Sequence, residues 1–473
     1  MREFIRSFFL LGIATTIEKI IAFVLLPIYT SYFDVVEYAV IDLIFVFIST
    51  TSIFAELQLE TALQRYYYDF TGKDKRMLIS TNFMVIILLS ILLTAIIIVF
   101  SETISITLFD KPNYNNIIKI ASLQLPFINF SMLSFIVLRY EKKNKLFLIL
   151  MLIKVIITLI FTLLFVVVFK LGVIGVFYSQ VIGLLISSLF LFFAVKEHLS
   201  LKSSSFFLNK SFSYALPQFP ARIGSTLLSF ANRFFMVNYL TLTSIGLFSL
   251  SLKLASVIQL LNTAFVMAWA PFMFEQFKII THRQNFAKVL ILATCPIYCI
   301  VCGITLFSKE IIELVSTKEF YESYKYIGGL ALYFSLYIFK EIVDIGPKYK
   351  EQTKYLSYTF FASVVFNLIF LFLLIKNFEL PGVVLAMILT NVFLLVVSWI
   401  VSNHLYFIPH RHIQFMVLSI PTFIIAIGSM YVYPSVVYRI SLFFVMFFLY
   451  SISFYKHLKT SSLNIEQYNT GLN

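Results

Sequence analysis

The sequence predicts an all-α polytopic membrane protein with about 14 transmembrane helices. Three observations support this fold class. Hydrophobic residues occupy 60% of the 473 positions and charged residues only 12%, which is about half the charged content of a soluble domain. Apolar runs of about 20 residues, each long enough to cross about 30 Å of hydrocarbon, recur along the whole chain. Two stretches in different halves of the chain also match each other, which predicts an internal repeat.

The apolar segments follow one another with short connections. The first continues past Glu18 and Lys19 and lacks a small-residue cleavage site, so we interpret it as a retained span and not as a signal peptide. The longest outer connection, residues 308–323, leaves no room for a soluble domain. The predicted spans cover residues 8–29, 38–59, 78–100, 116–138, 146–169, 173–195, 211–238, 242–268, 286–307, 324–346, 355–376, 381–402, 413–431 and 436–455.

The basic residues predict the orientation of these spans. Lysine and arginine concentrate in cytoplasmic loops of membrane proteins, and an inside N-terminus assigns most of the 36 basic residues to the cytoplasmic side. The loops on that side read RYYYDFTGKDKR, RYEKKNK and KYKEQTK, whereas an outer loop reads SYFDVVEY. We therefore expect both termini in the cytoplasm. The formal charge of +13 follows from these loops and does not indicate nucleic-acid binding.

The internal repeat predicts two lobes. Residues 138–171 align with residues 347–380, with Tyr140 over Tyr349, Lys145 over Lys354 and a Leu-Ile-Phe triplet in both. The offset corresponds to an even number of spans, so both copies have the same orientation in the membrane. We expect a lobe of about six helices at 1–200, a second at 201–405, and two extra helices with a short tail at 406–473. Parallel repeats of this kind are typical of alternating-access transporters.

Two arginines occur in the predicted seventh span. Arg222, Ser225, Ser229 and Arg233 are spaced 3, 4 and 4 residues apart and therefore share one helix face. Two prolines just before them should loosen the first turns. An arginine at mid-membrane depth costs about 2.5–3.5 kcal/mol, so this face should point into protein or water. Arg222 is too deep to reach an interface, whereas Arg233 could either line a cavity or extend to the outer headgroups.

Other predicted spans also contain charged residues. Lys19, Lys154 and Lys253 add cations, while Glu18 and Asp42 add acids. The acids Asp42, Glu56 and Glu60 share a face of the second span. Glu18 and Lys19 could also belong to an interhelical ion pair. We expect these acids to offset only some of the cations and to leave Arg222, Arg233 and Lys253 without partners.

Some polar residues have a structural explanation. Lys340 and Asp344 stand at i and i+4 in the predicted tenth span, a spacing that suits an ion pair. The cysteines Cys295, Cys299 and Cys302 share one helix face with no histidine beside them, which favours packing over metal or redox chemistry. The sequence therefore indicates no metal site and no cofactor.

The surplus of buried cations predicts an anionic ligand. Guanidinium groups match phosphate oxygens in geometry, so we expect a phosphate or pyrophosphate group to bind there. Lys19, Lys154, Arg222, Arg233 and Lys253 are the candidate binding residues. Glu18 and Asp42 are candidates for binding a coupling ion, either H⁺ or Na⁺.

The chain as a whole resembles the polysaccharide flippase branch of the multidrug/oligosaccharidyl-lipid/polysaccharide exporter superfamily. The resemblance rests on LLPIYTSYFDVVEYAVIDL, LETALQRYYYDF, ANRFFMVNYLTLTSIGLFSLSLKLA and AFVMAWAPFMFEQF, together with the LGVIGV and LPGVVLA starts of two later spans. Two positions depart from the pattern: Ala39 stands where relatives often have glycine, and Asn232 where an acid commonly precedes the arginine.

This resemblance implies a function. Such relatives move an oligosaccharide, linked to polyprenyl pyrophosphate, from the inner to the outer leaflet of the cytoplasmic membrane for cell-surface polysaccharide synthesis. The implied partners are this lipid-linked oligosaccharide and membrane lipids, with a polysaccharide polymerase and chain-length machinery as further candidates. Lys19, Arg222, Arg233 and Lys253 would contact the head group.

Alternative functions remain open at this stage. A flippase for the peptidoglycan lipid precursor has similar chemistry, and a cation-coupled multidrug exporter belongs to the same superfamily. A membrane polysaccharide polymerase or ligase would present a large external loop, which this sequence lacks. The sequence contains no Walker loop or nucleophile elbow, so we expect a transporter and not an enzyme.

Overall fold

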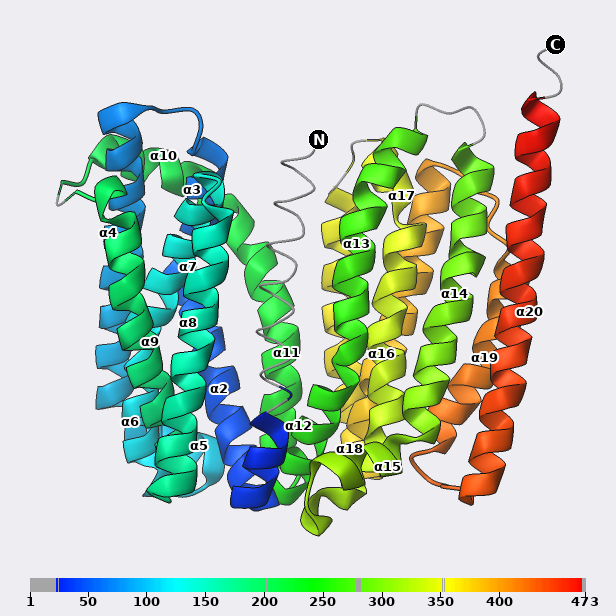
Figure 1. Ribbon diagram of the computed structural model, residues 1–473, viewed down its shortest axis with the longest axis horizontal. Coiled ribbons are helices and arrows are strands. Elements are labelled where there is room, and N and C mark those ends of the chain that lie inside the picture. The colour runs from blue at the N-terminus through cyan, green and yellow to red at the C-terminus, as the bar shows by residue number, and fades with distance from the viewer. Residues whose placement is uncertain are drawn as a thin grey trace. The chain divides into compact units, whose positions relative to one another are not determined.

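The computed structural model describes residues 23, 25–200, 202–277, 282–350, 352 and 354–469 (Figure 1). Every regular element in these ranges is a helix, which confirms the predicted all-α class. Contacts between helices divide the chain into two compact units. The first ends at Val237 and also includes Thr241–Gly246, and the second comprises Asn238–Leu240 and the chain from Leu247 onward. The lobe boundaries derived from the repeat remain a prediction.

The described chain contains ten helices that are long and apolar enough to cross a membrane. One of them, α18 (Lys354–Leu405), is interrupted at Glu379, where φ is 50° and ψ is −129°, so its two halves correspond to the predicted spans 355–376 and 381–402. The shorter apolar helix α19 (His412–Gly428) matches the predicted span 413–431. The predicted first span, with Glu18 and Lys19, lies mostly outside the described residues.

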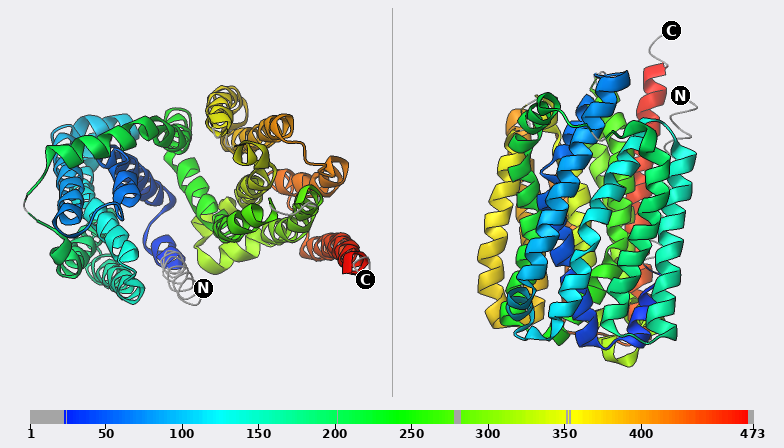
Figure 2. Two further views of the ribbon diagram at one scale, coloured as in Figure 1. Left: turned by 90° about the horizontal axis from the view of Figure 1, so that it is seen from above. Right: turned by 90° about the vertical axis from the view of Figure 1, so that its left-hand side faces the viewer.

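The first unit is a bundle whose long helices run roughly along one direction (Figure 2). The break before its last helix coincides with the two prolines noted in the sequence: α10 ends at Ala215, a short 3₁₀ turn covers Leu216–Gln218, and α11 begins at Phe219. The helices of this unit are α2 (Val35–Glu56), α3 (Leu59–Tyr66), α4 (Gly72–Val99), α5 (Ser101–Phe109), α6 (Asn115–Ser122), α7 (Gln124–Tyr140), α8 (Asn144–Thr162), α9 (Val173–Val195), α10 (Ser205–Ala215) and α11 (Phe219–Tyr239).

Local sequence determines both ends of α2. At its start, Asp34 accepts a hydrogen bond from the Glu37 backbone at 2.7 Å, and the Asp34 N–H donates to the Glu37 carboxylate at 3.1 Å. This reciprocal cap satisfies N–H groups that the first turn leaves without partners. At the other end, Leu57 and Gln58 adopt left-handed backbone angles and separate α2 from α3. The acids Asp34 and Glu37 therefore have a structural role at the helix start.

Apolar packing and one ion pair hold α3, α4 and α7 together at the end of the unit that the sequence assigns to the cytoplasm. Leu59, Leu63, Leu78 and related side chains form a buried cluster there. Beside it, the Glu141 carboxylate accepts hydrogen bonds from Lys75 at 2.6 Å and from the Tyr67 hydroxyl at 2.7 Å. Burial alone would raise the pKa of Glu141, but these donors outweigh it and hold the pKa below its usual value.

The second unit is built around α14 and α16, which pack on each other and on the surrounding helices. Tyr298 of α14 and Phe339 of α16 are both fully buried, with ring centroids 4.9 Å apart. The helices of this unit are α12 (Leu242–Ala255), whose first turn belongs to the first unit, α13 (Val257–Gln276), α14 (His282–Leu306), α15 (Ser308–Val315), α16 (Tyr324–Val343), α17 (Ile345–Tyr349), α18, α19 and α20 (Val436–Asn469).

The second unit contains the residues for which the sequence predicted structural roles, namely the Lys340–Asp344 ion pair and the cysteines of α14. Lys340 Nζ lies 2.7 Å from the Asp344 carboxylate, which confirms the predicted i, i+4 pair. Asp344 is 1% exposed, so the lysine compensates a charge that water does not reach. Cys295 and Cys302 are buried, as packing residues should be. No group of histidine, cysteine or acidic residues suited to a metal occurs in the described part of the chain.

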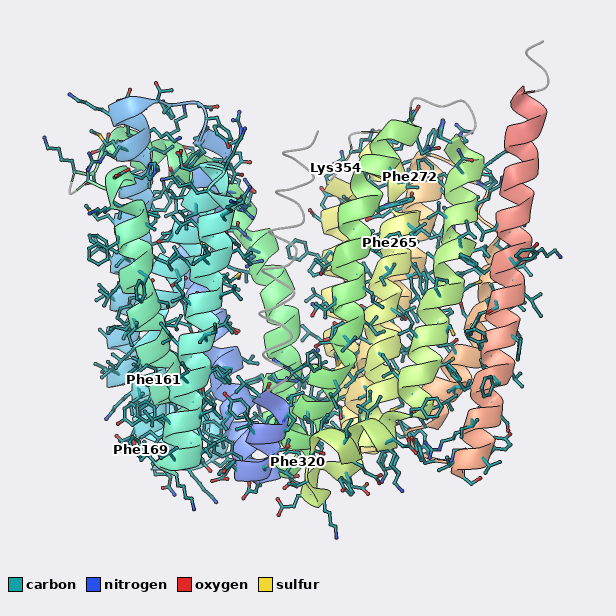
Figure 3. All side chains as sticks on the ribbon, in the orientation of Figure 1. Phe161, Phe169, Phe265, Phe272, Phe320 and Lys354 are labelled. Atoms are coloured by element: carbon teal, nitrogen blue, oxygen red, sulfur yellow. The ribbon has the colours of Figure 1, made fainter. Side chains whose placement is uncertain are left out.

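The outer faces of the helices carry apolar side chains, as lipid contact requires (Figure 3). Phe161 and Phe169, labelled in Figure 3, lie near the end of α8, and Phe169 is exposed. On α20, Val437, Phe448 and Ile452 are similarly exposed. Ten described helices are long and apolar enough to cross a membrane, and several of them carry exposed apolar side chains, as in a multi-pass membrane protein.

An ion pair attaches α20 to α15, and its removal should destabilise the second unit. Arg439 is 2% exposed and donates to both oxygens of Glu310, at 2.8 and 2.7 Å. We expect Glu310→Ala to lower stability by about 1–3 kcal/mol, because it leaves a buried guanidinium without its carboxylate. Thermal unfolding of the purified protein in detergent measures this loss. Glu313→Ala, an exposed acid on the same helix, is the control and should change the midpoint little.

Candidate functional site

Arg233 of α11 and Asp42 of α2 form a buried ion pair in the first unit. The guanidinium Nη2 lies 2.8 Å from the Asp42 carboxylate, and Arg233 is 6% exposed. The expectation that Arg233 lacks a partner is therefore wrong, and in this structure the residue does not extend to headgroups. The physical reason is that a carboxylate on a neighbouring helix compensates the charge better than a long reach to water. The sequence could not show this because it does not reveal which faces of α2 and α11 meet.

The start of α12 packs closely against the start of α2 near this ion pair. A Cβ atom on Gly246 would lie 2.1 Å from the Val35 carbonyl oxygen, well inside van der Waals contact. Only glycine allows this approach without a shift of the backbone. Together with the Arg233–Asp42 pair, the contact joins α2 to α11 and to the first turn of α12.

A second charged group lies at the other end of α2. Arg222 of α11 is exposed, and its charge acts on both Glu56 and Glu60. Glu60 lies in α3, beyond the predicted membrane segment of α2, and burial together with the Glu56 charge raises the pKa of Glu60 to about 7; Arg222 opposes this shift. Of the acids that share a face in the sequence, Asp42 contacts Arg233, and Glu56 and Glu60 feel the charge of Arg222.

A chain of buried hydrogen bonds leads away from Glu56. The Ser52 hydroxyl lies 3.1 Å from a Glu56 oxygen and 2.7 Å from the Asn129 amide oxygen. The Asn129 amide donates to Ser90 at 2.8 Å, and Ser90 donates to the Ile86 carbonyl at 2.7 Å. Ser52 has a single hydrogen, so it cannot donate to both of its oxygen neighbours. The hydrogen of Ser52 is therefore shared between the Glu56 carboxylate and the Asn129 amide oxygen.

Sequence reasoning did not identify Asn129 and Ser90. Both are fully buried, on α7 and α4, where they join Ser52 of α2. Single serine and asparagine residues are common in membrane helices and often bond to the preceding turn, so no spacing rule singles them out. The signal that could have found them is Asn129 itself, since an amide in an apolar helix must find partners on neighbouring helices.

The remaining predicted site residues lie in different parts of the chain. Lys154 is half-buried on α8 of the first unit, and Lys253 is exposed on α12 in the second unit. Glu18 and Lys19 are outside the described residues. Within the first unit, the structure pairs Arg233 with Asp42, and the charge of Arg222 acts on Glu56 and Glu60. Their convergence with Lys253 remains a prediction.

Comparison with known protein families gives a match over the N-terminal part of the chain. A family model described as "Polysaccharide biosynthesis protein" matches residues 4–277, more than half of the chain. The matched range includes both arginines of α11 and all three acids that face them. No curated protein matches the chain by sequence.

Solved structures resemble the fold over most of its length. A lipid II flippase MurJ in an inward closed conformation has a TM-score of 0.69 at 19% identity, covering 94% of this chain and 98% of its own. An inward-facing multidrug resistance MATE family transporter of the MOP superfamily has a TM-score of 0.68 at 14% identity, covering 87% and 99%. A MOP superfamily transporter from Pyrococcus furiosus, reported with a binding pocket of reverse polarity, has a TM-score of 0.57 at 13% identity, covering 84% and 95%. These similarities establish the transporter fold.

The raised pKa of Glu60 predicts a pH-dependent stability. Its ionised form is disfavoured in the fold, so the protein should lose stability as the pH rises from about 4.5 to about 7. Glu60→Gln removes this loss. We expect the variant to match the original protein at pH 4 and to unfold at a higher temperature at pH 8, by about 2–4 °C for each kcal/mol recovered. Thermal unfolding across this pH range measures the difference.

The control for this experiment is Glu102→Gln, an exposed acid on α5. Its midpoint should follow that of the original protein at every pH. A Glu60→Gln variant that tracks the original protein from pH 4 to pH 8 would contradict the assignment.

Proposed function

Because the chain belongs to the polysaccharide biosynthesis protein family, within the MOP superfamily of transporters, we propose that it is a flippase for polyprenyl-pyrophosphate-linked oligosaccharide. It moves the repeat unit from the inner to the outer leaflet by alternating access, for cell-surface polysaccharide synthesis. The observation that carries the proposal is the family match over residues 4–277, which contains the charged residues of the first unit. In this proposal a polysaccharide polymerase and chain-length machinery receive the product.

The location follows from the same proposal. The chain is a multi-pass membrane protein, and we place it in the cytoplasmic membrane with both termini inside. The distribution of lysine and arginine supports this orientation. The loop between α18 and α19, with His410 and Arg411, then faces the cytoplasm.

The proposed site binds the pyrophosphate head group through Lys19, Lys154, Arg222, Arg233 and Lys253. Arg233 can bind the head group only under one condition, because its guanidinium is already bound to the Asp42 carboxylate. A phosphate oxygen and a carboxylate compete for the same planar fork of donors. The head group therefore gains Arg233 when Asp42 releases it, and a cation or proton on Asp42 favours that release.

The membrane potential supplies part of the energy in this proposal. An inside-negative potential favours outward movement of a negative head group by about 2.3 kcal/mol per charge per 100 mV. The empty carrier must then return with its basic residues compensated. Asp42 restores the pair with Arg233 for this step, with Glu18 as the second proposed coupling residue.

A peptidoglycan lipid-precursor flippase is the second candidate. The similarity to the lipid II flippase covers 94% of this chain and so extends into the C-terminal helices, whereas the inward-facing drug transporter covers 87%. A cation-coupled drug exporter fits less well, because the basic residues of the proposed site disfavour cationic substrates. The family match favours the oligosaccharide carrier over both.

Arg222→Ala tests the proposed head-group site. We expect flipping of a fluorescent polyprenyl-pyrophosphate oligosaccharide in proteoliposomes to fall by about tenfold or more, since a charged hydrogen bond contributes about 1.5–3 kcal/mol. The flipping rate of Arg222→Lys should lie between those of the original protein and Arg222→Ala, because lysine keeps the charge but lacks the paired N–H donors of guanidinium. Lys73→Ala, an exposed cation outside the site, is the matched control. Full flipping by a well-inserted Arg222→Ala protein would exclude this residue.

Asp42→Asn tests the exchange at Arg233. The amide removes the competing charge and leaves the guanidinium available, so we expect tighter binding of the lipid-linked substrate but slower turnover. Binding by fluorescence anisotropy and flipping in proteoliposomes separate the two effects. Asp34→Asn, an acid of the outer helix cap, is the control. Weaker substrate binding by Asp42→Asn would contradict the exchange.

A further inference from the structure

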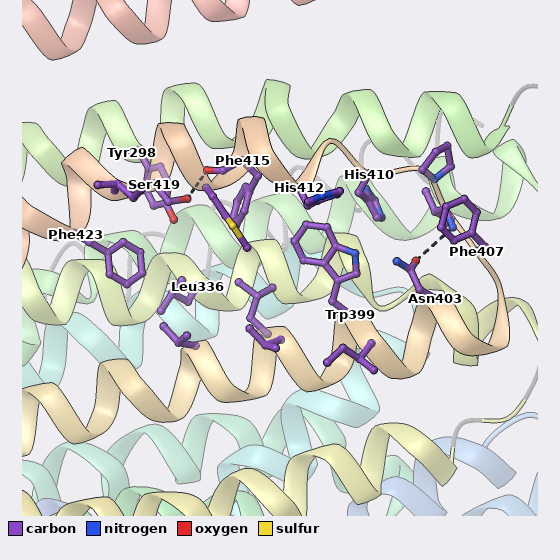
Figure 4. A pocket seen from close by; sticks show the side chains of 18 of the residues that line it. Tyr298, Leu336, Trp399, Asn403, Phe407, His410, His412, Phe415, Ser419 and Phe423 are labelled. Carbon is purple, nitrogen blue, oxygen red and sulfur yellow. Dashed lines mark hydrogen bonds between the residues drawn. The ribbon is translucent and has the colours of Figure 1, made fainter.

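A large apolar groove lies in the second unit between the C-terminal half of α18 and α19. Its volume is about 1170 Å³, which is enough for a lipid chain and part of a head group. Figure 4 shows Phe423 and Ser419 toward one end and Trp399, His410 and His412 toward the other. The proposed head-group residues do not line it, so the groove is separate from that site.

The length of the groove matches one leaflet of a bilayer. Its α18 wall runs from Val392 to His404, about 18 Å of helix, and its α19 wall from His412 to Ile424 is equally long. Half of a hydrocarbon core is about 15 Å thick. Valine, leucine, isoleucine and phenylalanine make up most of these walls. The groove therefore suits a hydrocarbon chain that ends near the membrane midplane.

One end of the groove contains a buried imidazole without hydrogen-bond partners. His410 is 6% exposed, and neither ring nitrogen has a partner among the described residues. Burial lowers the pKa of His410 to about 4, so the ring is neutral and has one donor and one acceptor nitrogen. Each unsatisfied buried polar atom costs about 1–3 kcal/mol. The ring is thus suited to a ligand that offers both an acceptor and a donor.

No acidic residue lines this end of the groove, so no carboxylate there would repel an anion. Residues 399–416 contain three histidines and Arg411 but no acid. His404 and His412 line the groove and are exposed, whereas Arg411 does not line it and has its guanidinium 2.8 Å from the His457 ring of α20. Trp399 packs edge-on against His410, with ring centroids 5.4 Å apart. Tryptophan is enriched at the interface between hydrocarbon and head groups, which suits this end of the groove.

We propose that this groove binds an anionic glycerophospholipid with hydroxyls in its head group, of the phosphatidylglycerol type, from the cytoplasmic leaflet. One acyl chain fills the space between α18 and α19. The His410 N–H donates to a phosphate or ester oxygen, and its second nitrogen accepts from a head-group hydroxyl. The choice of leaflet rests on the orientation proposed above, whereas binding itself does not depend on the flippase function.

The two tryptophans of the chain allow a direct test. Trp269→Phe leaves Trp399, in the groove, as the only tryptophan. The full-length protein is placed in phosphatidylcholine vesicles with a small fraction of brominated phosphatidylglycerol, or the same fraction of brominated phosphatidylcholine. We expect the anionic lipid to quench Trp399 several-fold more strongly. Equal quenching by the two lipids would mean that bulk lipid fills the groove and would overturn the proposal.

Variants separate the head-group contact from the chain contact. His410→Leu should abolish the preference for phosphatidylglycerol, and His410→Gln should retain it, because glutamine supplies both a donor and an acceptor. Val396→Phe fills the groove and should reduce quenching, whereas Val365→Phe, an exposed valine in the other half of α18, should not. A preference unchanged by both His410→Leu and Val396→Phe would overturn the proposal.

Two further measurements identify other occupants. Trp399→Phe, which retains buried Trp269, should show no dependence on the brominated lipid. A polyprenyl phosphate that relieves quenching where excess phosphatidylglycerol does not would assign the groove to a substrate tail and overturn the proposal. Lipid binding is measured without transport, so its failure leaves the proposed flippase function untouched.

Discussion

Compensation of buried charge is the constraint on which the rest of this structure depends. In hydrocarbon an isolated guanidinium is costly, and Arg233 remains in the membrane because Asp42 lies 2.8 Å away. Lys340 with Asp344 and Arg439 with Glu310 follow the same rule in the second unit. Each pair also fixes the helices or turns that carry it. Two of these pairs, Arg233 with Asp42 and Arg439 with Glu310, join different helices, so charge pairing contributes to helix packing beside apolar contact.

The sequence predicted the fold well because the membrane imposes a simple rule. Every backbone group must bond within its own helix, so the length and spacing of apolar runs give the number and position of the spans. The i, i+4 pair of Lys340 and Asp344 was predictable because both residues lie on one helix. The division of contacts near residue 240 was not evident, since it depends on which helices α10 and α11 pack against.

The sequence predicted which charged residues belong to the site but not which of them pair with each other. The sequence identified Arg222, Arg233, Asp42, Glu56 and Glu60 as residues of two helix faces, and the structure brings those faces together. Which acid meets which arginine depends on the rotation and depth of α11 relative to α2, and hydropathy contains no such information. The hydrogen-bonded chain from Ser52 to Ser90 depends on three helices at once and is still harder to predict.

The pairing changes how an anion can be recognised. A free buried arginine would bind any phosphate that reached it, and it would hold the product as tightly as the substrate. An arginine already bound to Asp42 offers only the difference between two similar interactions, so head-group binding and release need little net energy. In this proposal, a cation or proton on Asp42 favours binding of Arg233 to the head group, and its loss favours the Arg233–Asp42 pair. In the proposed carrier, binding of a cation or proton and capture of the pyrophosphate are thus two sides of one exchange at Arg233.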